Sequence, residues 1–159
     1  MKKIRLFISD VDGVMTDSGM YYTNSGDEFK KFNTRDGMGF ELLKNNNIYT
    51  AIITSESTMI VENRAKKLKV DFLFQGQKFN GKFNAAIKLC NELNISLKEV
   101  AYIGDDINCI ELLKNVGLAA CPSDAHFKVK SIPEILVLNT KGGEGVVREF
   151  VEIILADII

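Results

Sequence analysis

Two aspartates follow an apolar, strand-like run near the start of the sequence. Residues 4–8 form this run, and Asp10, Asp12 and Gly13 come directly after it. In an extended backbone this spacing places both carboxylates on the same side. Two carboxylates at close range repel each other, so we expect them to share a cation or a proton. A solvated turn is the competing interpretation, because Asp-x-Asp-Gly is also ordinary turn chemistry.

A second acidic cluster follows another apolar run, residues 100–103. Here Gly104 is succeeded by Asp105 and Asp106, with Asn108 close behind. Hard oxygen ligands without a surrounding set of histidines and cysteines favour Mg²⁺ over Zn²⁺. Capping of a helix by Asp105 or Asp106 is the structural alternative. It accounts for one aspartate, but not for two strand ends that both carry them.

Two further positions could bind a phosphate group. Thr54 and Ser55 follow the apolar run 49–53 and come shortly before a predicted helix, where a hydroxyl and backbone amides can hold phosphate oxygens. A plain Ser/Thr helix cap is the alternative. Lys82 opens another predicted helix, where a positive charge opposes the helix dipole unless it faces an anion. Lys78 competes for that role, and a solvated lysine remains a third interpretation.

The elements that must position these residues alternate between strand and helix. Strand-length apolar runs occur at residues 4–8, 49–53, 72–74, 100–103, 118–120 and 135–138. Amphipathic, helix-length stretches lie between most of them, and residues 146–155 close the chain in the same pattern. This alternation predicts an α/β fold with a doubly wound, Rossmann-like parallel sheet covered on both faces. Such sheets bind ligands at the carboxyl ends of their strands.

Residues 17–33 interrupt the alternation. Two β-prone runs flank an Asn/Gly turn, which predicts a β-hairpin inserted directly after the first strand. The chain has no internal repeat and no linker composition. We therefore expect a single domain over residues 1–159.

Composition excludes several classes of protein. The 159 residues include 20 Lys+Arg and 21 Asp+Glu, a formal net charge of −1, which does not suit a nucleic-acid or acidic-membrane binder. No apolar run is long enough to span a bilayer, and the first residues do not resemble a secretory signal. The 3 cysteines are odd in number and lack a C-x-x-C pair, which is typical of reduced thiols in a cytoplasmic protein.

The order Asp10-x-Asp12, Thr54, Lys82, Asp105-Asp106 resembles the four-part signature of the haloacid dehalogenase (HAD) superfamily of phosphohydrolases. Within it, nearly the whole chain is similar to the small capless phosphatases of 3-deoxy-2-keto sugar-acid phosphates. These act on 3-deoxy-D-manno-octulosonate 8-phosphate or on nonulosonate 9-phosphates. The stretches that carry the resemblance are residues 10–17, 32–37, 101–106 and 142–149, together with Gln75-Gly76 and Lys82.

The resemblance implies a role for each of these residues. Asp10 would be the nucleophile that forms an aspartyl-phosphate, and Asp12 would be the general acid and base. The Asp10 carboxylate, the Asp12 carbonyl and Asp105 would hold Mg²⁺, with Asp106 close behind. Candidates for binding the sugar-acid phosphate are Thr54, Ser55, Lys82, Asn33, Arg35, Glu56, Lys67 and Arg148.

The sugar itself is not decided by the sequence. Glu56 together with Lys67 is similar to the nonulosonate branch, whereas Arg35-Asp36-Gly37 is similar to the octulosonate branch. Arg35 could bind the substrate carboxylate or form a structural salt bridge. The segment between Gly76 and Lys82 is longer than in close relatives, which keeps Lys78 open as the phosphate-binding lysine.

Two other functions compete with a phosphatase. A phosphorylatable receiver domain also combines acidic residues, a Thr and a Lys on a doubly wound sheet. In a receiver, however, the acidic pair opens the chain and the Lys comes last, whereas here Asp105 follows Lys82. An inactive oligomerisation domain of a sugar-nucleotide transferase is the second alternative, and the intact Asp10 and Asp12 argue against it.

The resemblance also implies assembly. The hairpin carries Met20, Tyr21, Tyr22, Phe29 and Phe32, more apolar surface than a lone two-stranded ribbon can bury. In the family such hairpins pack at the centre of a homotetramer. We therefore expect a homotetramer in which the hairpin and the glycine-rich tail, residues 142–145 with Arg148, wall the active site. A plain loop before the final helix is the alternative for the tail.

Overall fold

The fold is built on a six-stranded sheet. The computed structural model describes residues 3–156, so the expected domain of residues 1–159 extends beyond the described part at both ends. The strand order is β5-β4-β1-β6-β7-β8, and every pairing is parallel. The strands are β1 (Leu6–Ser9), β4 (Tyr49–Ile53), β5 (Phe72–Phe74), β6 (Val100–Ile103), β7 (Leu118–Cys121) and β8 (Leu136–Val137).

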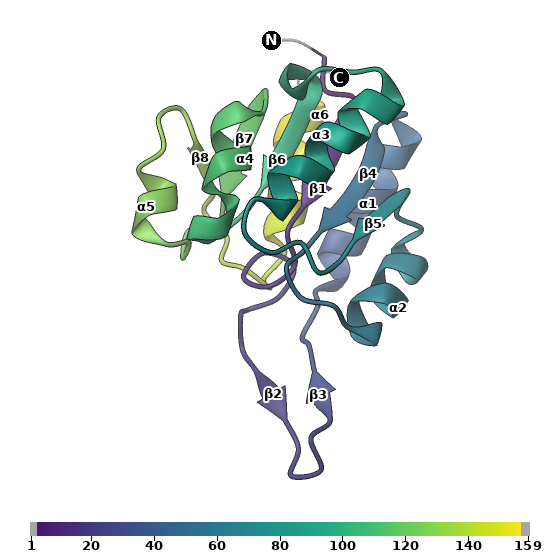
Figure 1. The fold of residues 1–159 in the computed structure, drawn as a ribbon, viewed down its shortest axis with the longest axis vertical. Helices are drawn as coiled ribbons and strands as arrows, with labels where there is room; N and C mark the ends of the chain where they lie inside the picture. The colour runs from purple at the N-terminus through teal and green to yellow at the C-terminus, as the bar shows by residue number, and fades with distance from the viewer. Residues whose placement is uncertain (1–2, 157–159) are drawn as a thin grey trace.

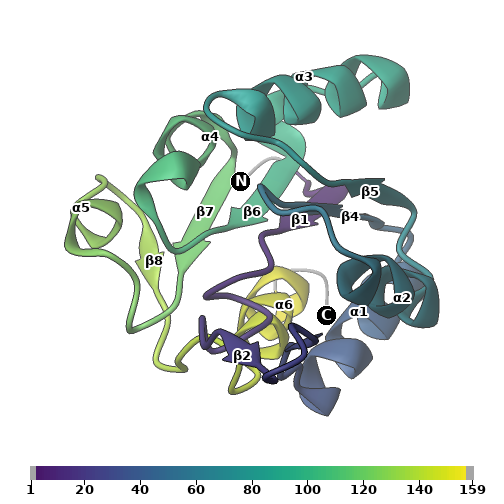
Figure 2. The ribbon, with the colours of Figure 1, turned by 60° about the horizontal axis from the view of Figure 1, so that its bottom comes forward.

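Helices cover both faces of this sheet, as Figure 2 shows. One face packs against α1 (Thr34–Asn45), α2 (Met59–Leu68) and α6 (Val146–Ala156). The other packs against α3 (Gly81–Leu93), α4 (Ile110–Asn115) and α5 (Phe127–Lys130). Short 3₁₀ turns at η1 (Leu97–Glu99) and η2 (Ile107–Cys109) flank β6. The sheet is thus buried on both sides, as its nearly continuous apolar strands require.

Alternation along each central strand supplies both cores. In β1, Phe7 contributes to the core on the α1 and α6 face, while Leu6 and Ile8 contribute to the core on the α3 and α4 face. All of these side chains are fully buried. The predicted doubly wound α/β fold is therefore confirmed, with strand ends that shift by one or two residues: β1 ends at Ser9 and β8 is only Leu136–Val137.

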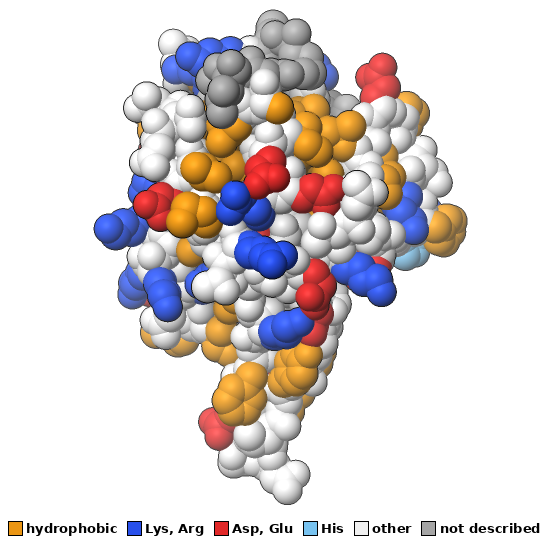
Figure 3. Space-filling model, turned by 180° about the vertical axis from the view of Figure 1, so that it is seen from behind, with side chains coloured by type: hydrophobic (Ala, Val, Ile, Leu, Met, Phe, Trp, Pro, Cys, Tyr) orange, Lys and Arg blue, Asp and Glu red, His pale blue; other side chains and the backbone are white. Residues whose placement is uncertain are grey.

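The predicted hairpin is present and projects from the body of the molecule (Figure 1). It consists of β2 (Tyr21–Tyr22) and β3 (Glu28–Phe29), which pair antiparallel over only two residues each. It leaves the sheet on the side where the strands have their carboxyl ends (Figure 1). Its apolar side chains are exposed, and Figure 3 shows several of them side by side on its surface.

The register of the sheet brings the two acidic strand ends together. β1 lies beside β6, with Ser9 opposite Ile103. The ladder continues one step further, because the Asp10 amide donates to the Ile103 carbonyl at 3.1 Å. Asp10 and Asp105 therefore emerge from neighbouring strands at the same edge of the sheet.

Candidate active site

Asp10 and Lys82 form a buried ion pair at the end of β1. Lys82 Nζ lies 2.5 Å from Asp10 Oδ2, and both side chains are almost completely removed from water. The other oxygen, Asp10 Oδ1, accepts the Val11 amide at 2.8 Å. Burial opposes the charge on Lys82, but the charge of Asp10 together with the contacts to Asp10 and Cys109 outweighs burial, so the pKa of Lys82 is raised. Lys78, by contrast, is exposed.

Cys109 completes this cluster. Its thiol donates to Asp10 Oδ2 at 3.2 Å, and its Sγ accepts from Lys82 Nζ at 3.4 Å. Burial, reinforced by the charge of Asp10, raises the pKa of the Cys109 thiol to about 12. The thiol is therefore protonated near neutral pH. It acts as a hydrogen-bond donor to Asp10, and not as a thiolate nucleophile.

Asp105 faces Asp10 from the end of β6. Ligand atoms of Asp10, Asp105 and Cys109 all lie within 4.8 Å of one another. Burial, and then the charge of Asp10, raises the pKa of Asp105 to about 7. Two carboxylates so close together, Asp10 buried and Asp105 partly buried, favour a further cation in addition to the ammonium of Lys82. Their hard oxygen atoms fit Mg²⁺, whereas the protonated thiol of Cys109 is a poor ligand for it.

Gly13 permits this approach of the two strand ends. It has a φ of +82°, and a Cβ at its position would lie 1.8 Å from Asp105 Oδ2. Any other residue would therefore collide with the carboxylate and strain the backbone. The glycine of the Asp-x-Asp-Gly sequence thus makes room for the second acidic residue.

Asp12 has a lysine partner of its own. Lys30, directly after β3, places its Nζ 2.7 Å from Asp12 Oδ1 and 3.4 Å from Glu28 Oε1. Burial opposes the charge of Lys30, but the hydrogen bond to Asp12 and the charges of both acids leave its pKa raised. The hairpin therefore delivers a cation to the edge of the site.

Thr54 and Ser55 lie at the end of β4, the other neighbour of β1. Thr54 is buried, and its amide donates to the Phe74 carbonyl at 2.9 Å. Ser55 Oγ accepts from Asn108 Nδ2 at 3.0 Å, which links this loop to the one after β6. Hydroxyl groups and acidic residues thus come from three adjacent strand ends.

Other sequence-predicted residues make local contacts. Asn33 caps α1 by accepting the Arg35 amide at 2.9 Å, and its Nδ2 donates to the Gly143 carbonyl at 3.3 Å. Arg148 pairs with Glu152 along α6 at 2.7 Å. Asp106 caps the turn η2 by accepting the Ile107 amide. The remaining candidates, Arg35, Glu56 and Lys67, are exposed.

The glycine-rich tail packs on the loop that carries the acidic residues. A Cβ at Gly142 would lie 2.1 Å from the Gly13 carbonyl oxygen. The Gly143 amide donates to the Val14 carbonyl at 2.9 Å. Lys31 at the base of the hairpin pairs with Glu144 at 2.7 Å. The tail, the base of the hairpin and the loop after β1 are therefore in contact within one chain.

Two members of the cluster were not predicted from the sequence. Lys30 reaches Asp12 across 18 positions of the chain, and nothing in the local pattern of the hairpin marks it. The sequence predicts Cys109 only as one of three reduced thiols, although it follows the acidic cluster closely and lies in the turn η2. The position of Cys109, four residues after Asp105, was the one available signal.

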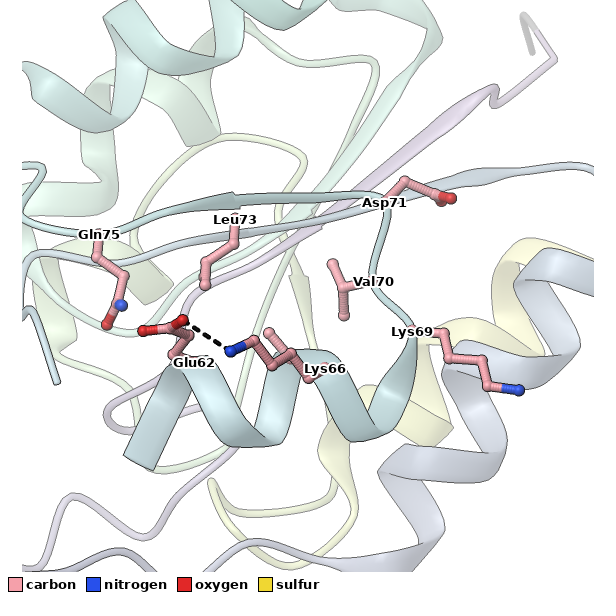
Figure 4. A pocket seen from close by; sticks show the side chains of 8 residues that line it. Glu62, Lys66, Lys69, Val70, Asp71, Leu73 and Gln75 are labelled. Atoms are coloured by element: carbon pink, nitrogen blue, oxygen red, sulfur yellow. Dashed lines mark ion pairs between the residues drawn. The ribbon is translucent and has the colours of Figure 1, made fainter. Parts of the chain in front are cut away.

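The pocket in Figure 4 is separate from this cluster. It lies between α2 and β5 and is lined by Glu62, Lys66 and Gln75 among others. Glu62 and Lys66 neutralise each other as an ion pair at 2.9 Å, and the lining includes none of Asp10, Lys82 and Asp105. Its residues offer no comparable chemistry.

A parallel sheet with a buried Asp–Lys pair at the end of its central strand, and a second aspartate on the next strand, defines a phosphoryl-transfer hydrolase of the haloacid dehalogenase type. The family model described as haloacid dehalogenase-like hydrolase matches residues 76–150. Similar proteins with more specific names match almost the full chain. The 3-deoxy-D-manno-octulosonate 8-phosphate phosphatase of Yersinia pestis is 42% identical over 153 residues, 96% of this chain and 80% of that protein. The one from Escherichia coli K12 is 39% identical, over 97% of this chain and 80% of the relative.

Solved structures agree with this result. The 3-deoxy-D-manno-octulosonate 8-phosphate phosphatase of Moraxella catarrhalis, in complex with a magnesium ion, a phosphate ion and KDO, superposes with a TM-score of 0.91. It is 35% identical, and the match covers 96% of this chain and 86% of that one. The chain belongs to the 3-deoxy-D-manno-octulosonate 8-phosphate phosphatase family of haloacid dehalogenase-like hydrolases. It is accordingly a phosphoric monoester hydrolase.

Proposed function

We propose that the protein is a Mg²⁺-dependent phosphatase of a phosphorylated 3-deoxy-2-keto sugar acid, with 3-deoxy-D-manno-octulosonate 8-phosphate as its substrate. The observation that carries the proposal is the buried contact of Asp10 with Lys82, with Asp105 beside it. A carboxylate held in this way can accept a phosphoryl group while neighbouring positive charge offsets repulsion by the phosphate oxygens. The names of the relatives support the choice of sugar acid.

In the first half-reaction, the Asp10 carboxylate attacks phosphorus and the bond from phosphorus to the sugar oxygen breaks. The carboxyl group of Asp12 gives its proton to that leaving oxygen. Lys82 binds a non-bridging oxygen of the transferring group. Thr54 and Ser55, at the end of β4, hold the other oxygens through a hydroxyl group and backbone amides.

In the second half-reaction, water attacks the phosphorus of the aspartyl-phosphate. Asp12, now a carboxylate, takes a proton from that water, and the bond between Asp10 and phosphorus breaks to release phosphate. Mg²⁺, when bound by Asp10, the Asp12 carbonyl and Asp105, neutralises charge on the phosphoryl oxygens. Asp106 follows Asp105 in the chain and is assigned to a position just outside the residues that would contact the ion.

The rest of the substrate is assigned to residues around the edge of the sheet. Arg35 and Arg148 supply positive charge for the sugar carboxylate, and Asn33 supplies an amide. Glu56 and Lys67 are assigned to contacts with the far end of the sugar. Glu56 and Lys67 both occur in this sequence, as in the nonulosonate branch, so a nonulosonate 9-phosphate is the substrate to compare.

Phosphate release from octulosonate 8-phosphate and a nonulosonate 9-phosphate, measured in parallel with Mg²⁺, tests the proposal. We expect turnover that EDTA abolishes, with the higher kcat/KM for the octulosonate. Asp10→Asn should lower kcat by a factor on the order of 10³ or more, because the nucleophile is lost. The exposed acid-to-amide variant Glu92→Gln is the matched control and should keep wild-type turnover.

Three outcomes would contradict this function. Full activity of Asp10→Asn would show that Asp10 is not the nucleophile. Activity in excess EDTA would show that the reaction does not need a metal ion. A stable phosphoryl-enzyme formed once per chain, without continuing release of phosphate, would instead identify a receiver domain.

We also propose that the enzyme works as a cytoplasmic homotetramer of single-domain chains. All three cysteines are buried and unpaired, which suits a reducing compartment. No helix within residues 3–156 is long and apolar enough to cross a membrane. The exposed apolar side chains of the hairpin support assembly through that element.

A further inference from the structure

Lys30 is a buried cation that the reaction described above does not use. Its side chain is only 2% exposed, although it belongs to the stem of a projecting hairpin. Among the ion pairs of residues 3–156, only Lys30 and Lys82 contribute a lysine side chain buried to this degree. Each aspartate of the Asp-x-Asp sequence therefore has its own buried lysine.

Burying the Lys30 ammonium costs free energy, so a chance contact at the surface does not explain it. Exposed ion pairs contribute little, whereas a buried lysine must be matched by acceptors. Lys30 has two, Asp12 Oδ1 at 2.7 Å and Glu28 Oε1 at 3.4 Å. Its neighbour Lys31 shows the ordinary case, since it is half exposed and forms its 2.7 Å pair with Glu144 at the surface.

The geometry leaves one oxygen of Asp12 free. Lys30 occupies Oδ1, and within the described part of the chain Oδ2 accepts no hydrogen bond. The Asp12 side chain is 35% exposed, so substrate or water can reach it from solvent. A general acid and base needs one oxygen at a fixed place beside the leaving oxygen and later beside the attacking water.

We propose that Lys30 is a positioning residue, which holds Asp12 by Oδ1 so that Oδ2 faces the reacting oxygen in both half-reactions. Glu28 holds the ammonium from the other side and ties this contact to β3. The hairpin thus sets the orientation of the acid and base in its own chain. This role rests on the proposed function of Asp12.

The test compares Lys30→Met, which keeps most of the apolar stem, with Lys31→Met as the matched control. For the sugar-acid phosphate we expect Lys30→Met to lower kcat on the order of 10–100-fold with KM changed less than about threefold, because orientation and not binding is lost. Lys31→Met should stay within about twofold of wild type, since it loses only an exposed pair. Lys30→Arg should restore part of kcat, because it restores a cation.

Single-turnover kinetics with p-nitrophenyl phosphate separates positioning from general damage. Nitrophenolate leaves without a proton, so phosphorylation of Asp10 should be nearly normal in Lys30→Met. Hydrolysis of the aspartyl-phosphate still needs Asp12, so we expect a burst of about one nitrophenolate per active site followed by slow release of phosphate. A variant that is merely misfolded would lower burst amplitude and steady-state rate together.

A crystal structure of Lys30→Met gives a readout independent of activity. We expect the Asp12 side chain to leave its wild-type rotamer or to occupy more than one. An unchanged, single rotamer would overturn the proposal, and so would a kcat within twofold of wild type. A rise in KM confined to carboxylate-bearing substrates would show that Lys30 binds substrate instead. Failure of the proposed function is distinct, because the wild-type enzyme would then release no phosphate.

Should Lys30→Met not fold, Lys30→Gln and Glu28→Gln decide the same question. Lys30→Gln keeps a hydrogen-bond donor near Asp12 and should retain more kcat than a variant without one. Glu28→Gln leaves the contact between Lys30 and Asp12 intact and should lower kcat less than either substitution of Lys30. Equal kcat in Glu28→Gln and Lys30→Gln would contradict a specific role for the contact with Asp12.

Discussion

Lys82 and Asp10 stabilise each other in a place almost without water. Their atoms lie 2.5 Å apart, and the thiol of Cys109 contacts both. Removing one partner of a buried pair leaves the other charge uncompensated, which typically costs about 3–5 kcal/mol. The same ammonium is the group that would meet the negative charge of an incoming phosphate. In the proposed mechanism, stability and catalysis would therefore depend on the same contact.

This contact predicts a large difference between two nearby lysines. We expect Lys82→Met to lower kcat at least on the order of 10²-fold, because charge on the phosphoryl group is no longer offset. Its melting temperature should fall as well, since the buried Asp10 carboxylate loses its compensating positive charge. Lys78→Met, at an exposed position, should match wild type in both measurements. The reverse ranking in a phosphate-release assay would assign the phosphate to Lys78.

At the residue scale, the sequence predicted side chains that follow strands and missed those that arrive from elsewhere. Asp10 and Asp105 were predictable because parallel strands end at a common edge. Lys82 was singled out because its charge opposes the dipole of α3. Lys30 was not, since its contact depends on how the hairpin folds back toward the loop after β1. A local pattern carries no information about that distance in space.

Among the helices, the contact between α1 and α6 carries an unusual buried acid. Asp36, in the first turn of α1, is fully buried, and its Oδ1 accepts the Arg148 amide at 3.1 Å. It thereby caps the start of α6, where a negative charge is favourable. Its Oδ2 has no hydrogen-bond partner within the described residues. Burial raises the pKa of Asp36 to about 6, although hydrogen bonds from backbone amides and the charge of Arg64 favour the ionised carboxylate.

This raised pKa predicts how stability depends on pH. A carboxyl group with a higher pKa in the folded state stabilises the fold when protonated, and that contribution is lost as pH rises from about 4 through about 6. Asp36→Asn keeps the acceptor for the Arg148 amide and cannot ionise. We therefore expect a gain in unfolding free energy of up to about 3 kcal/mol above pH 7, shrinking to less than about 1 kcal/mol near pH 4.

Urea unfolding of wild type and Asp36→Asn across this range would measure the effect, with the exposed Glu92→Gln as control. A gain of equal size at every pH would show that Asp36 is not the titrating group. A loss of stability above pH 7 would show that its charge is needed beside Arg64.

Secondary structure was largely predictable because each strand is an uninterrupted apolar run, as expected for a sheet covered on both faces. The order of the strands was not. Nothing in the separate runs states that β1 lies between β4 and β6, although this order is what brings Thr54, Asp10 and Asp105 together. The hairpin was predicted as a type of element, but its strands are shorter than the β-prone runs suggested, only two residues each. A two-stranded ribbon without further strands is only marginally stable in water, so fewer residues pair than the local β propensity predicts.

At the scale of the whole molecule, the hairpin is the feature that a single chain does not explain. Met20, Tyr21, Tyr22 and Phe29 are each between 44% and 61% exposed. Figure 3 shows hydrophobic side chains exposed along the projecting hairpin. An apolar surface of this kind is typical of an interface between protein chains. The same hairpin borders the acidic cluster at the end of β1, because its stem delivers Lys30 to Asp12.

Assembly through the hairpin should therefore be sensitive to charge at its apolar side chains. We expect the wild-type chain to give about four times the chain mass in size-exclusion chromatography with light scattering, as closed symmetry allows. Tyr22→Glu and Phe29→Glu should each shift the mass toward smaller species, because like charges would be buried together. Phe127→Glu, an equally exposed aromatic on α5, should leave the mass unchanged. Activity should fall with the mass, because in the proposed tetramer each subunit would help to exclude water from the phosphoryl-transfer site of its neighbour. A monomeric variant with full kcat would show that the hairpins assemble the enzyme without closing its sites, and a monomeric wild-type chain would refute the tetramer itself.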